Sequence, residues 1–377
     1  MKKKVGIVTI HDIFNYGSVL QAYATQKVIA EMGYDVEIID YKYPNEYHKR
    51  KRSLLNNIKN YILHKSNSFL KDLLPGKKYS TYKKNYVKFK KENYNLGPVR
   101  YKNFVQLKKN PPVYDIYVSG SDQIWRPEFV KNDECFFLNF VNKGKKISYA
   151  SSFSSANIPE EYQSTYRAYL LDYDYLSTRE KSGINIIHKL TGKDSVLVLD
   201  PTLLLDKSEW NKVLTEFISD EPYILCYGQN FGDSYMENLA KYISTNIFLN
   251  FKIIRLNGRF NDFFNKKIMC ILDAGPAEFL GLFKNASIVL AQSFHATIFS
   301  IIFERNFISL LRGKENHDSR QLNLLEVLNL SDRKIYIGDD FEKSVLLKND
   351  IDYNKVNKIL EEERKKSKNY LQNSLLN

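Results

Sequence analysis

The fold is decided by residues 5–41, which read VGIVTIHDIFNYGSVLQAYATQKVIAEMGYDVEIIDY. The apolar run at 5–10 predicts a short buried strand, and residues 19–32 predict a helix that ends at Gly33, a residue type favoured just past helix C-termini. A second strand is predicted at 36–41. A strand, a helix and a strand in this order indicate a right-handed parallel unit, the opening of a doubly wound α/β sheet.

The same alternation continues along the chain. It predicts strands at 114–119, 147–153, 175–177, 196–199, 223–227, 252–256 and 288–291. It predicts helices at 235–243, 276–284, 297–303 and 353–371. Because the pattern starts again after a connecting stretch at 206–221, we predict two Rossmann-like domains, residues 1–205 and 206–377, facing each other across a cleft. The last helix is expected to close the second domain.

The positive charge is concentrated in one segment. The formal net charge is +13, and residues 47–110 hold 18 Lys and Arg against two acids, which leaves −3 for the remainder. Apolar residues at helical spacing predict a basic helical excursion from the first domain. Either its apolar stripe packs on its own domain, or residues 49–91 make peripheral contact with an anionic membrane surface or hold another anionic ligand. Nucleic acid is not expected, because helix-turn-helix, zinc-finger and RNP-type patterns are missing from the segment.

Composition narrows the class further. With 43% hydrophobic and 26% charged residues, the chain resembles folded rather than disordered proteins. Its three cysteines form neither a CxxC pair nor a Cys/His pattern, so neither a disulfide framework nor a metal site is expected. The N-terminal lysines precede only six apolar residues, and no stretch approaches the roughly 20 of a membrane span. These features predict a cytoplasmic protein.

Two loops that follow predicted strands carry candidate ligand contacts, because ligands of open α/β sheets bind beyond the carboxyl ends of strands. The first loop offers Asn15, Tyr16, Gly17 and Ser18. Its glycine allows close backbone approach and its polar residues can donate hydrogen bonds, although a tight turn has the same sequence. The second loop offers Ser121, Asp122, Gln123 and Trp125. Its carboxylate and its indole suit sugar recognition, and the alternative is a capped helix with a core tryptophan.

The third loop contains the residue best suited to proton transfer. Gln292, Ser293 and His295 follow the strand predicted at 288–291 and precede an apolar helix. Imidazole is the usual group for moving a proton near neutral pH. A single histidine is often structural, but His295 stands among small polar residues at a strand-to-helix transition. We therefore predict that it acts as a general acid and base.

These loops and several further blocks stand in the order of a known family. The blocks are NYG at 15–17 with VLQAYA after it, GSDQIW at 120–125, STREKSG at 177–183, DPT at 200–202, Gly275-Pro276 with Glu278-Phe279, SFH at 293–295 and DSR at 318–320. Together they resemble the polysaccharide pyruvyl transferase family from residue 5 to about residue 330. The resemblance implies a glycosyltransferase-B-like fold with an acceptor side in the first domain and a donor side in the second.

The resemblance also implies an activity. Phosphoenolpyruvate would be the donor substrate without a further cofactor, and a sugar of a cell-surface polysaccharide, or of its lipid-diphosphate-linked precursor, would be the acceptor. The histidine matching His295 is then catalytic, and arginines hold the donor. The donor's phosphate and carboxylate suit guanidinium forks, so Arg179 and Arg320 are candidates, although an ion pair between domains is an equal alternative for each. Many family members have an arginine where this chain has Ser293, and we predict that Arg320 compensates.

Two other functions fit the same residues. The first is a nucleotide-sugar-dependent glycosyltransferase of the same fold, because fold alone does not determine chemistry. The second is a non-catalytic glycan-binding protein.

Overall fold

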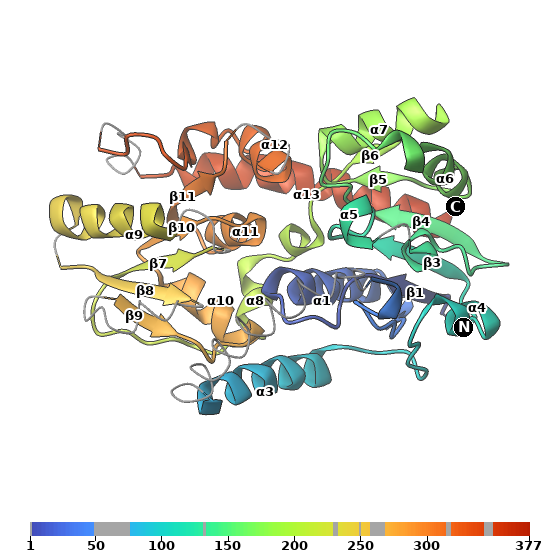
Figure 1. Ribbon diagram of the computed structural model, residues 1–377, viewed down its shortest axis with the longest axis horizontal. Helices are drawn as coiled ribbons and strands as arrows, with labels where there is room; N and C mark the ends of the chain where they lie inside the picture. Colours follow the sequence, from blue (N-terminus) through green and yellow to red (C-terminus); the bar gives the residue numbers. More distant parts are fainter. Residues whose placement is uncertain are drawn as a thin grey trace, which may run out of the picture.

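The structure is a computed structural model that describes residues 2–48, 76–130, 133–228, 233–248, 250–256, 268–313, 318–342 and 350–377. It contains two parallel sheets side by side (Figure 1). The first has the order β2-β1-β3-β4 and the second the order β12-β11-β10-β7-β8-β9. We refer to residues up to 205 as the N-terminal half and to the remainder as the C-terminal half.

The N-terminal half builds the four-stranded sheet from short, buried strands. Its strands are β1 (Lys4–Val8), β2 (Asp35–Ile38), β3 (Ile116–Gly120) and β4 (Lys145–Tyr149), with a two-stranded sheet of β5 (Ser177–Thr178) and β6 (Val196–Leu197). Its helices include α1 (Tyr16–Glu31), α3 (Gly76–Asn93), α4 (Phe104–Lys109), α5 (Pro127–Val130), α6 (Glu160–Leu171) and α7 (Lys181–Thr191). Short 3₁₀ turns lie at Glu46–His48, Glu134–Phe137 and Pro201–Leu204. The predicted opening unit is confirmed, since β1 pairs in parallel with β2 across α1.

The C-terminal half builds the six-stranded sheet. Its strands are β7 (Tyr223–Tyr227), β8 (Lys252–Leu256), β9 (Ile268–Ile271), β10 (Ile288–Ala291), β11 (Asn306–Leu311) and β12 (Lys334–Tyr336). Its helices are α8 (Lys207–Asn211), α9 (Asp233–Tyr242), α10 (Pro276–Asn285), α11 (Phe294–Ile302), α12 (Ser319–Val327) and α13 (Tyr353–Leu376), with a π-helical turn at Ile243–Ile247 and a 3₁₀ turn at Ser331–Arg333. Strands β7, β8 and β10 have the predicted bounds. We had not predicted β9, β11 and β12.

One hydrophobic core runs through both halves. It includes Ile7 and Val118 from the first sheet and Leu225 and Val289 from the second, all less than 1% exposed. Between the sheets, the ring of Tyr16 at the start of α1 stacks on Phe279 of α10 with centroids 4.5 Å apart. Because an apolar interface this continuous resembles a domain core, we expect the two sheets to hold a defined relative position.

Two helices cross from one half to the other (Figure 1). Helix α13 begins in the C-terminal half and ends against the N-terminal sheet, where the Ser367 Oγ accepts a 2.9 Å bond from the Leu199 amide and the Tyr370 hydroxyl donates to the Ser148 carbonyl at 3.0 Å. The helix that we predicted to close the second domain therefore also closes the first. Helix α3 lies along both halves, and the Asn85 amide donates to the Asp273 carbonyl at 2.9 Å.

Helix α3 belongs to the basic segment. Tyr86 and Phe89 are buried against the protein, whereas Lys83, Lys84 and Lys88 are exposed. The apolar face of α3 therefore packs on the protein, whereas the apolar residues at helical spacing that predict the excursion, between 54 and 74, lie outside the described residues. Of the predicted membrane-contacting segment, residues 49–91, the part at 49–75 lies outside the described residues. Among the described residues, no helix combines the length and the apolar character needed to cross a bilayer.

Candidate active site

His295 lies where the two halves meet. It follows β10 in the first turn of α11, whose N-cap Ser293 accepts a 3.2 Å bond from the Ala296 amide through its hydroxyl. The His295 side chain is 11% exposed and rests on Gly17 of the other half. A Cβ placed on Gly17 would lie 2.0 Å from His295 Nδ1, so only glycine allows this approach. The loop after β1 and the loop after β10 thus converge at His295, as their predicted positions at strand ends require.

Within the described part of the chain, Asp200 is the carboxylate that lies within ion-pair distance of His295. Its Oδ2 lies 3.7 Å from His295 Nε2, which is electrostatic contact without a direct hydrogen bond. The same oxygen accepts a 2.5 Å bond from Arg179 Nη1. Burial alone would raise the pKa of Asp200, but His295 and Arg179 together lower it far below its usual range. Asp200 is therefore a fixed anion beside the imidazole.

Asp122 supplies a second carboxylate. One oxygen accepts a short hydrogen bond from the Ser18 hydroxyl, and the other lies 3.5 Å from Arg179 Nη2. Burial opposes ionisation, yet Arg179, His295 and the other neighbouring donors lower the pKa of Asp122. Its backbone has φ 72°, a left-handed conformation that non-glycine residues seldom adopt. Such strained residues are concentrated at functional sites.

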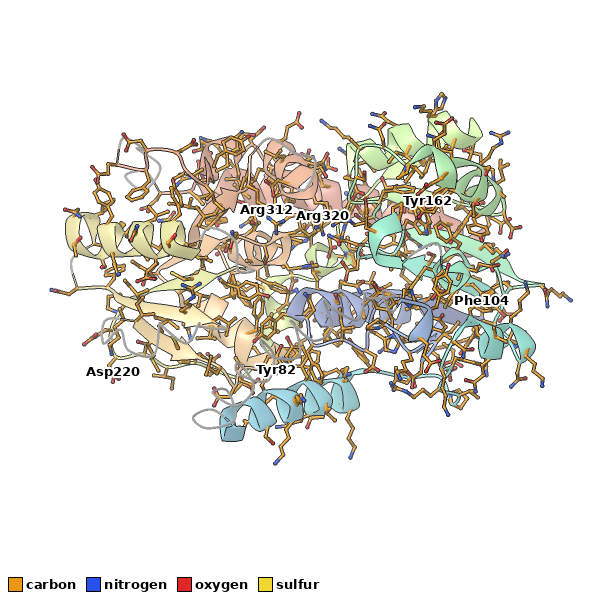
Figure 2. The ribbon with its side chains drawn as sticks, viewed as in Figure 1. Tyr82, Phe104, Tyr162, Asp220, Arg312 and Arg320 are labelled. Carbon is orange, nitrogen blue, oxygen red and sulfur yellow. The ribbon has the colours of Figure 1, made fainter. Side chains whose placement is uncertain are left out.

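Arg320 adds a second guanidinium group from α12, and Figure 2 shows it between the two halves. The guanidinium carbons of Arg179 and Arg320 lie 4.9 and 5.3 Å from the centre of the Phe294 ring, within range of cation–π attraction. Burial and the charge of Arg179 lower the pKa of Arg320 to about 10, so it remains protonated at neutral pH. Among the described residues, no carboxylate lies within ion-pair distance of Arg320, and its buried Nε has no hydrogen-bond partner.

The structure brings most of the predicted site residues together. The cluster contains His295, Arg179, Arg320, Gly17, Ser18, Ser121, Asp122 and Gln123. Asn15 and Ser293 have a local role at its edge, because each caps the helix that carries a site residue. Gln292 points elsewhere: its side chain packs on Gly228, at the end of β7.

The structure places two predicted substrate contacts among packed aromatic side chains rather than in the cluster. Trp125 is fully buried, stacks parallel to Phe137 at 5.8 Å and donates its indole N–H to the Phe136 carbonyl at 3.2 Å, so it offers no face to a sugar. Tyr16 is 1% exposed, and its hydroxyl donates to the Ala274 carbonyl at 2.8 Å. Both rings take the core role because burying a large aromatic surface is favourable and their polar atoms find backbone partners there.

Sequence reasoning missed two acids as site residues. Asp200 opens the DPT block after β6, and Glu180 ends the STRE block, whose first two residues form β5; both acids are at most 2% exposed. Their position at strand ends could have identified them. Glu180 follows β5, which lies beside β4, and Asp200 follows β6, which pairs with β5. Within the described ranges, acidic, histidine and cysteine side chains form no group of three or more that could hold a metal ion.

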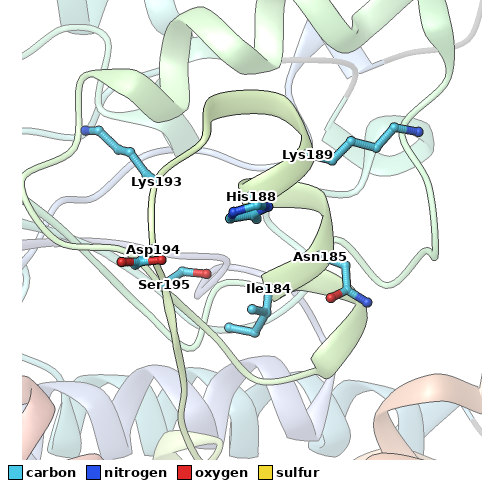
Figure 3. A pocket seen from close by; sticks show the side chains of 7 residues that line it. All are labelled: Ile184, Asn185, His188, Lys189, Lys193, Asp194 and Ser195. Atoms are coloured by element: carbon cyan, nitrogen blue, oxygen red, sulfur yellow. The ribbon is translucent and has the colours of Figure 1, made fainter.

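Two hollows differ in their relation to this cluster. One, of about 250 Å³, is lined by α7 and the loop after it, and none of its residues belongs to the cluster (Figure 3). Its Lys193 ammonium already donates to the carbonyls of Leu171 and Tyr173, both at 2.7 Å. The other, of about 20 Å³, adjoins Arg179, Asp200 and Phe294 and has room for about one water molecule.

Comparisons with known proteins agree with this architecture. A family model described as polysaccharide pyruvyl transferase matches residues 15–313. No curated protein matches the sequence.

Among solved structures, a putative UDP-N-acetylglucosamine 2-epimerase from Listeria monocytogenes is 9% identical, with 96% of this chain and 91% of that chain covered and a TM-score of 0.54. MnaA of S. aureus, in a co-structure with UDP, is 11% identical over 99% of this chain and 91% of that chain, with a TM-score of 0.50. The glycotransferase of kitacinnamycin is 8% identical over 100% of each chain, with a TM-score of 0.50. These likenesses confirm the predicted glycosyltransferase-B-like fold.

Proposed function

Because the chain belongs to the polysaccharide pyruvyl transferase family, we propose that it transfers the pyruvyl group of phosphoenolpyruvate to a sugar of a cell-surface polysaccharide or of its lipid-linked precursor, forming a ketal. One observation carries the proposal. An imidazole, two guanidinium groups and two ionised carboxylates meet where the halves join, and each comes from a loop or helix start beyond a strand.

The donor side is supported by a buried guanidinium group that forms no direct ion pair within the described part of the chain. Phosphoenolpyruvate carries a phosphate and a carboxylate, which guanidinium groups bind as forks. Arg179 is already paired with Asp200, whereas Arg320 has no carboxylate partner among the described residues. Helix α1 also begins beside His295, and the first amides of a helix favour anions.

The same arrangement supports Arg320 as a substitute for the arginine that many family members have at position 293. Ser293 is needed here as the N-cap of α11. Arg320 instead reaches the Phe294 ring, next to position 293, from the start of α12. One guanidinium group is thereby supplied from a neighbouring helix.

The chemistry needs proton transfers that His295 can perform. In the first step, the protonated imidazole gives its proton to C3 of the enol, a sugar hydroxyl adds to C2, and the imidazole accepts the proton of that hydroxyl. In the second step, another hydroxyl of the sugar adds to C2 while the bond from C2 to the phosphate oxygen breaks. The second hydroxyl proton leaves with inorganic phosphate. Asp200 keeps the imidazole oriented and stabilises its protonated form.

We place the reaction in the cytoplasm, on an acceptor carried by a lipid diphosphate at the membrane surface. The exposed lysines of α3 support this, because an anionic surface attracts such a row of charges. Binding to vesicles containing anionic lipid should weaken with added salt, and a Lys83→Glu, Lys84→Glu, Lys88→Glu variant should bind less than the wild type. Equal binding by both proteins would contradict the membrane placement.

The activity itself is tested by incubation with phosphoenolpyruvate and a panel of lipid-linked sugars. We expect phosphate release that depends on both substrates, with a pyruvylated sugar detected by mass spectrometry. Consumption of a nucleotide sugar without phosphoenolpyruvate would support a glycosyltransferase instead. Glycan binding without turnover of either donor would support a binding protein.

A further inference from the structure

A hydrogen bond joins the two halves beside the reacting centre. Gln123 follows β3 in the N-terminal half, and Arg320 opens α12 in the C-terminal half. A guanidinium group only donates hydrogen bonds, so the amide oxygen of Gln123 must face it. In this orientation the oxygen accepts from Arg320 Nη1 at 3.2 Å and also from Nη2. A single neutral oxygen thus receives both arms of the fork.

Neighbouring residues hold both the backbone and the side chain of Gln123. The backbone N–H of Gln123 donates to the Asp122 carboxylate at 2.9 Å, and the side-chain oxygen of Gln123 also accepts from the Ser154 hydroxyl at 3.2 Å. Asp122 and Ser154 both have left-handed backbones, with φ 72° and 47°. Two strained residues on either side of one amide indicate that its position is specified rather than incidental.

A buried carboxylate fixes the second of these residues without touching Arg320. Glu180 is 1% exposed. Its Oε1 accepts from the Ser152 hydroxyl and the Phe153 amide, both at 2.9 Å, and from the Ser154 amide at 3.2 Å. The loop after β4 is therefore held by a carboxylate that forms no direct ion pair with Arg320.

The neutral amide of Gln123 fixes the position of the Arg320 guanidinium group without placing a negative charge beside it. An acid at position 123 would orient Arg320 equally well but would neutralise it with an ion pair. An amide holds the guanidinium and leaves its charge available for an anionic ligand. We propose that Gln123 is a positioning residue that aims Arg320 at the anionic donor while leaving the guanidinium group without a direct ion pair. The identity of the donor rests on the proposed function, whereas the contact itself does not.

Two nearly isosteric variants test the charge argument. Gln123→Glu keeps the contact and adds a charge, and Gln123→Met loses the contact and adds none. At pH 8 we expect Gln123→Glu to raise the Kd for phosphoenolpyruvate, measured by calorimetry, at least tenfold, and Gln123→Met to raise it less. KM for the acceptor should change less than twofold in both. Lowering the pH below the ordinary pKa of glutamate, about 4.3, should narrow the gap between Gln123→Glu and wild type, because the ion pair with Arg320 lowers the pKa of the new carboxyl group.

The opposite order, with Gln123→Met worse than Gln123→Glu, would mean that Gln123 serves packing or orientation only and would overturn the proposal. An unchanged Kd in Gln123→Glu would also overturn it.

A second measurement does not depend on any substrate. In a double-mutant cycle of Gln123→Glu and Arg320→Met, followed by Tm, we expect Gln123→Glu to maintain or raise Tm when Arg320 is present and to lower it when Arg320 is replaced. Additive effects would overturn the contact. If the cycle shows coupling but the wild type binds no phosphoenolpyruvate, the proposed function fails while the contact stands.

Discussion

Tyr16 and Gly17 are neighbours at the start of α1, yet they belong to two different regions of the molecule. Tyr16 enters an aromatic junction, where its ring contacts Tyr86, Tyr227 and Phe279 and its hydroxyl has a backbone partner. Gly17 instead leaves room for His295, whose Nε2 has no hydrogen-bond partner among the described residues. The first region is aromatic and uncharged, although the buried Tyr86 hydroxyl has no hydrogen-bond partner among the described residues, and the second is charged.

The aromatic junction and the polar cluster have different roles in the molecule. The aromatic junction belongs to the core shared by both sheets, so it sets how the halves sit relative to each other. The polar cluster then takes residues from both halves and relies on that relative position. Buried charges and unpartnered nitrogen atoms cost stability, and they are tolerated where the surrounding structure over-determines their placement. Variants on the two sides should therefore separate folding from activity.

The largest expected effect is on activity and comes from His295→Ala. Loss of a general acid and base typically lowers turnover by about 10²- to 10⁴-fold. Asp200 keeps its bonds from Arg179 and Thr202, so folding should change little. Phosphate release measures the first effect and Tm the second. The matched control is His188→Ala, which removes an exposed histidine of the remote hollow and should keep wild-type turnover. Turnover within tenfold of wild type in His295→Ala would remove the imidazole from the mechanism.

Next in size is the effect of Phe279→Ala on stability. This ring is 0% exposed and contacts the rings of Tyr16, Tyr227 and Phe299. Truncation of such a residue lowers the free energy of unfolding by about 3–5 kcal/mol. Urea denaturation measures the change, and Phe14→Ala, at a ring that is 47% exposed, serves as the control with a much smaller expected loss. An equal loss in both variants would contradict the role of the junction.

A smaller effect, again on activity, is expected for Gly17→Ala. The new methyl group would lie 2.0 Å from His295 Nδ1, so the imidazole must shift. Displacement of a catalytic group by about 1 Å costs about 100-fold in turnover. Gly120→Ala is the control, because its added Cβ meets its nearest neighbours at an ordinary 3.5 Å. Wild-type turnover in Gly17→Ala would show that the contact between the halves does not position His295.

The comparison also explains which site residues could be predicted. The loops after β1, β3 and β10 could be predicted because parallel strands end at one edge, and a polar loop there is visible in the sequence. The roles of Tyr16 and Trp125 could not, since an aromatic residue in such a loop suits a ligand platform and a core equally. Their partners, Phe279 and Phe137, decide between the two. Those contacts depend on packing that local sequence does not encode.

Asp200 and Glu180 were missed for a related reason. Each follows a strand of only two residues, and each gains its role from distant partners: His295 for Asp200, and Ser152 for Glu180. The fold was predicted more fully, since the alternation of strands and helices is a local pattern. Strand β11 was not predicted, because the apolar helix α11 precedes it. Hydrophobic periodicity alone does not distinguish a buried strand from a buried helical segment. Strands β9 and β12 are short and lie at the sheet edges.

The smallest expected effect comes from Tyr16→Phe and tests the boundary between the two regions. The variant keeps the ring stacked on Phe279 and removes the hydroxyl, so the Ala274 carbonyl loses its 2.8 Å donor. A neutral hydrogen bond of this kind contributes about 1 kcal/mol, and we expect the free energy of unfolding to fall by that amount in urea denaturation. Turnover should stay within twofold of wild type, because the hydroxyl faces α10 rather than His295. A tenfold loss of turnover at unchanged stability would return Tyr16 to the substrate contacts and erase the division drawn between Tyr16 and Gly17.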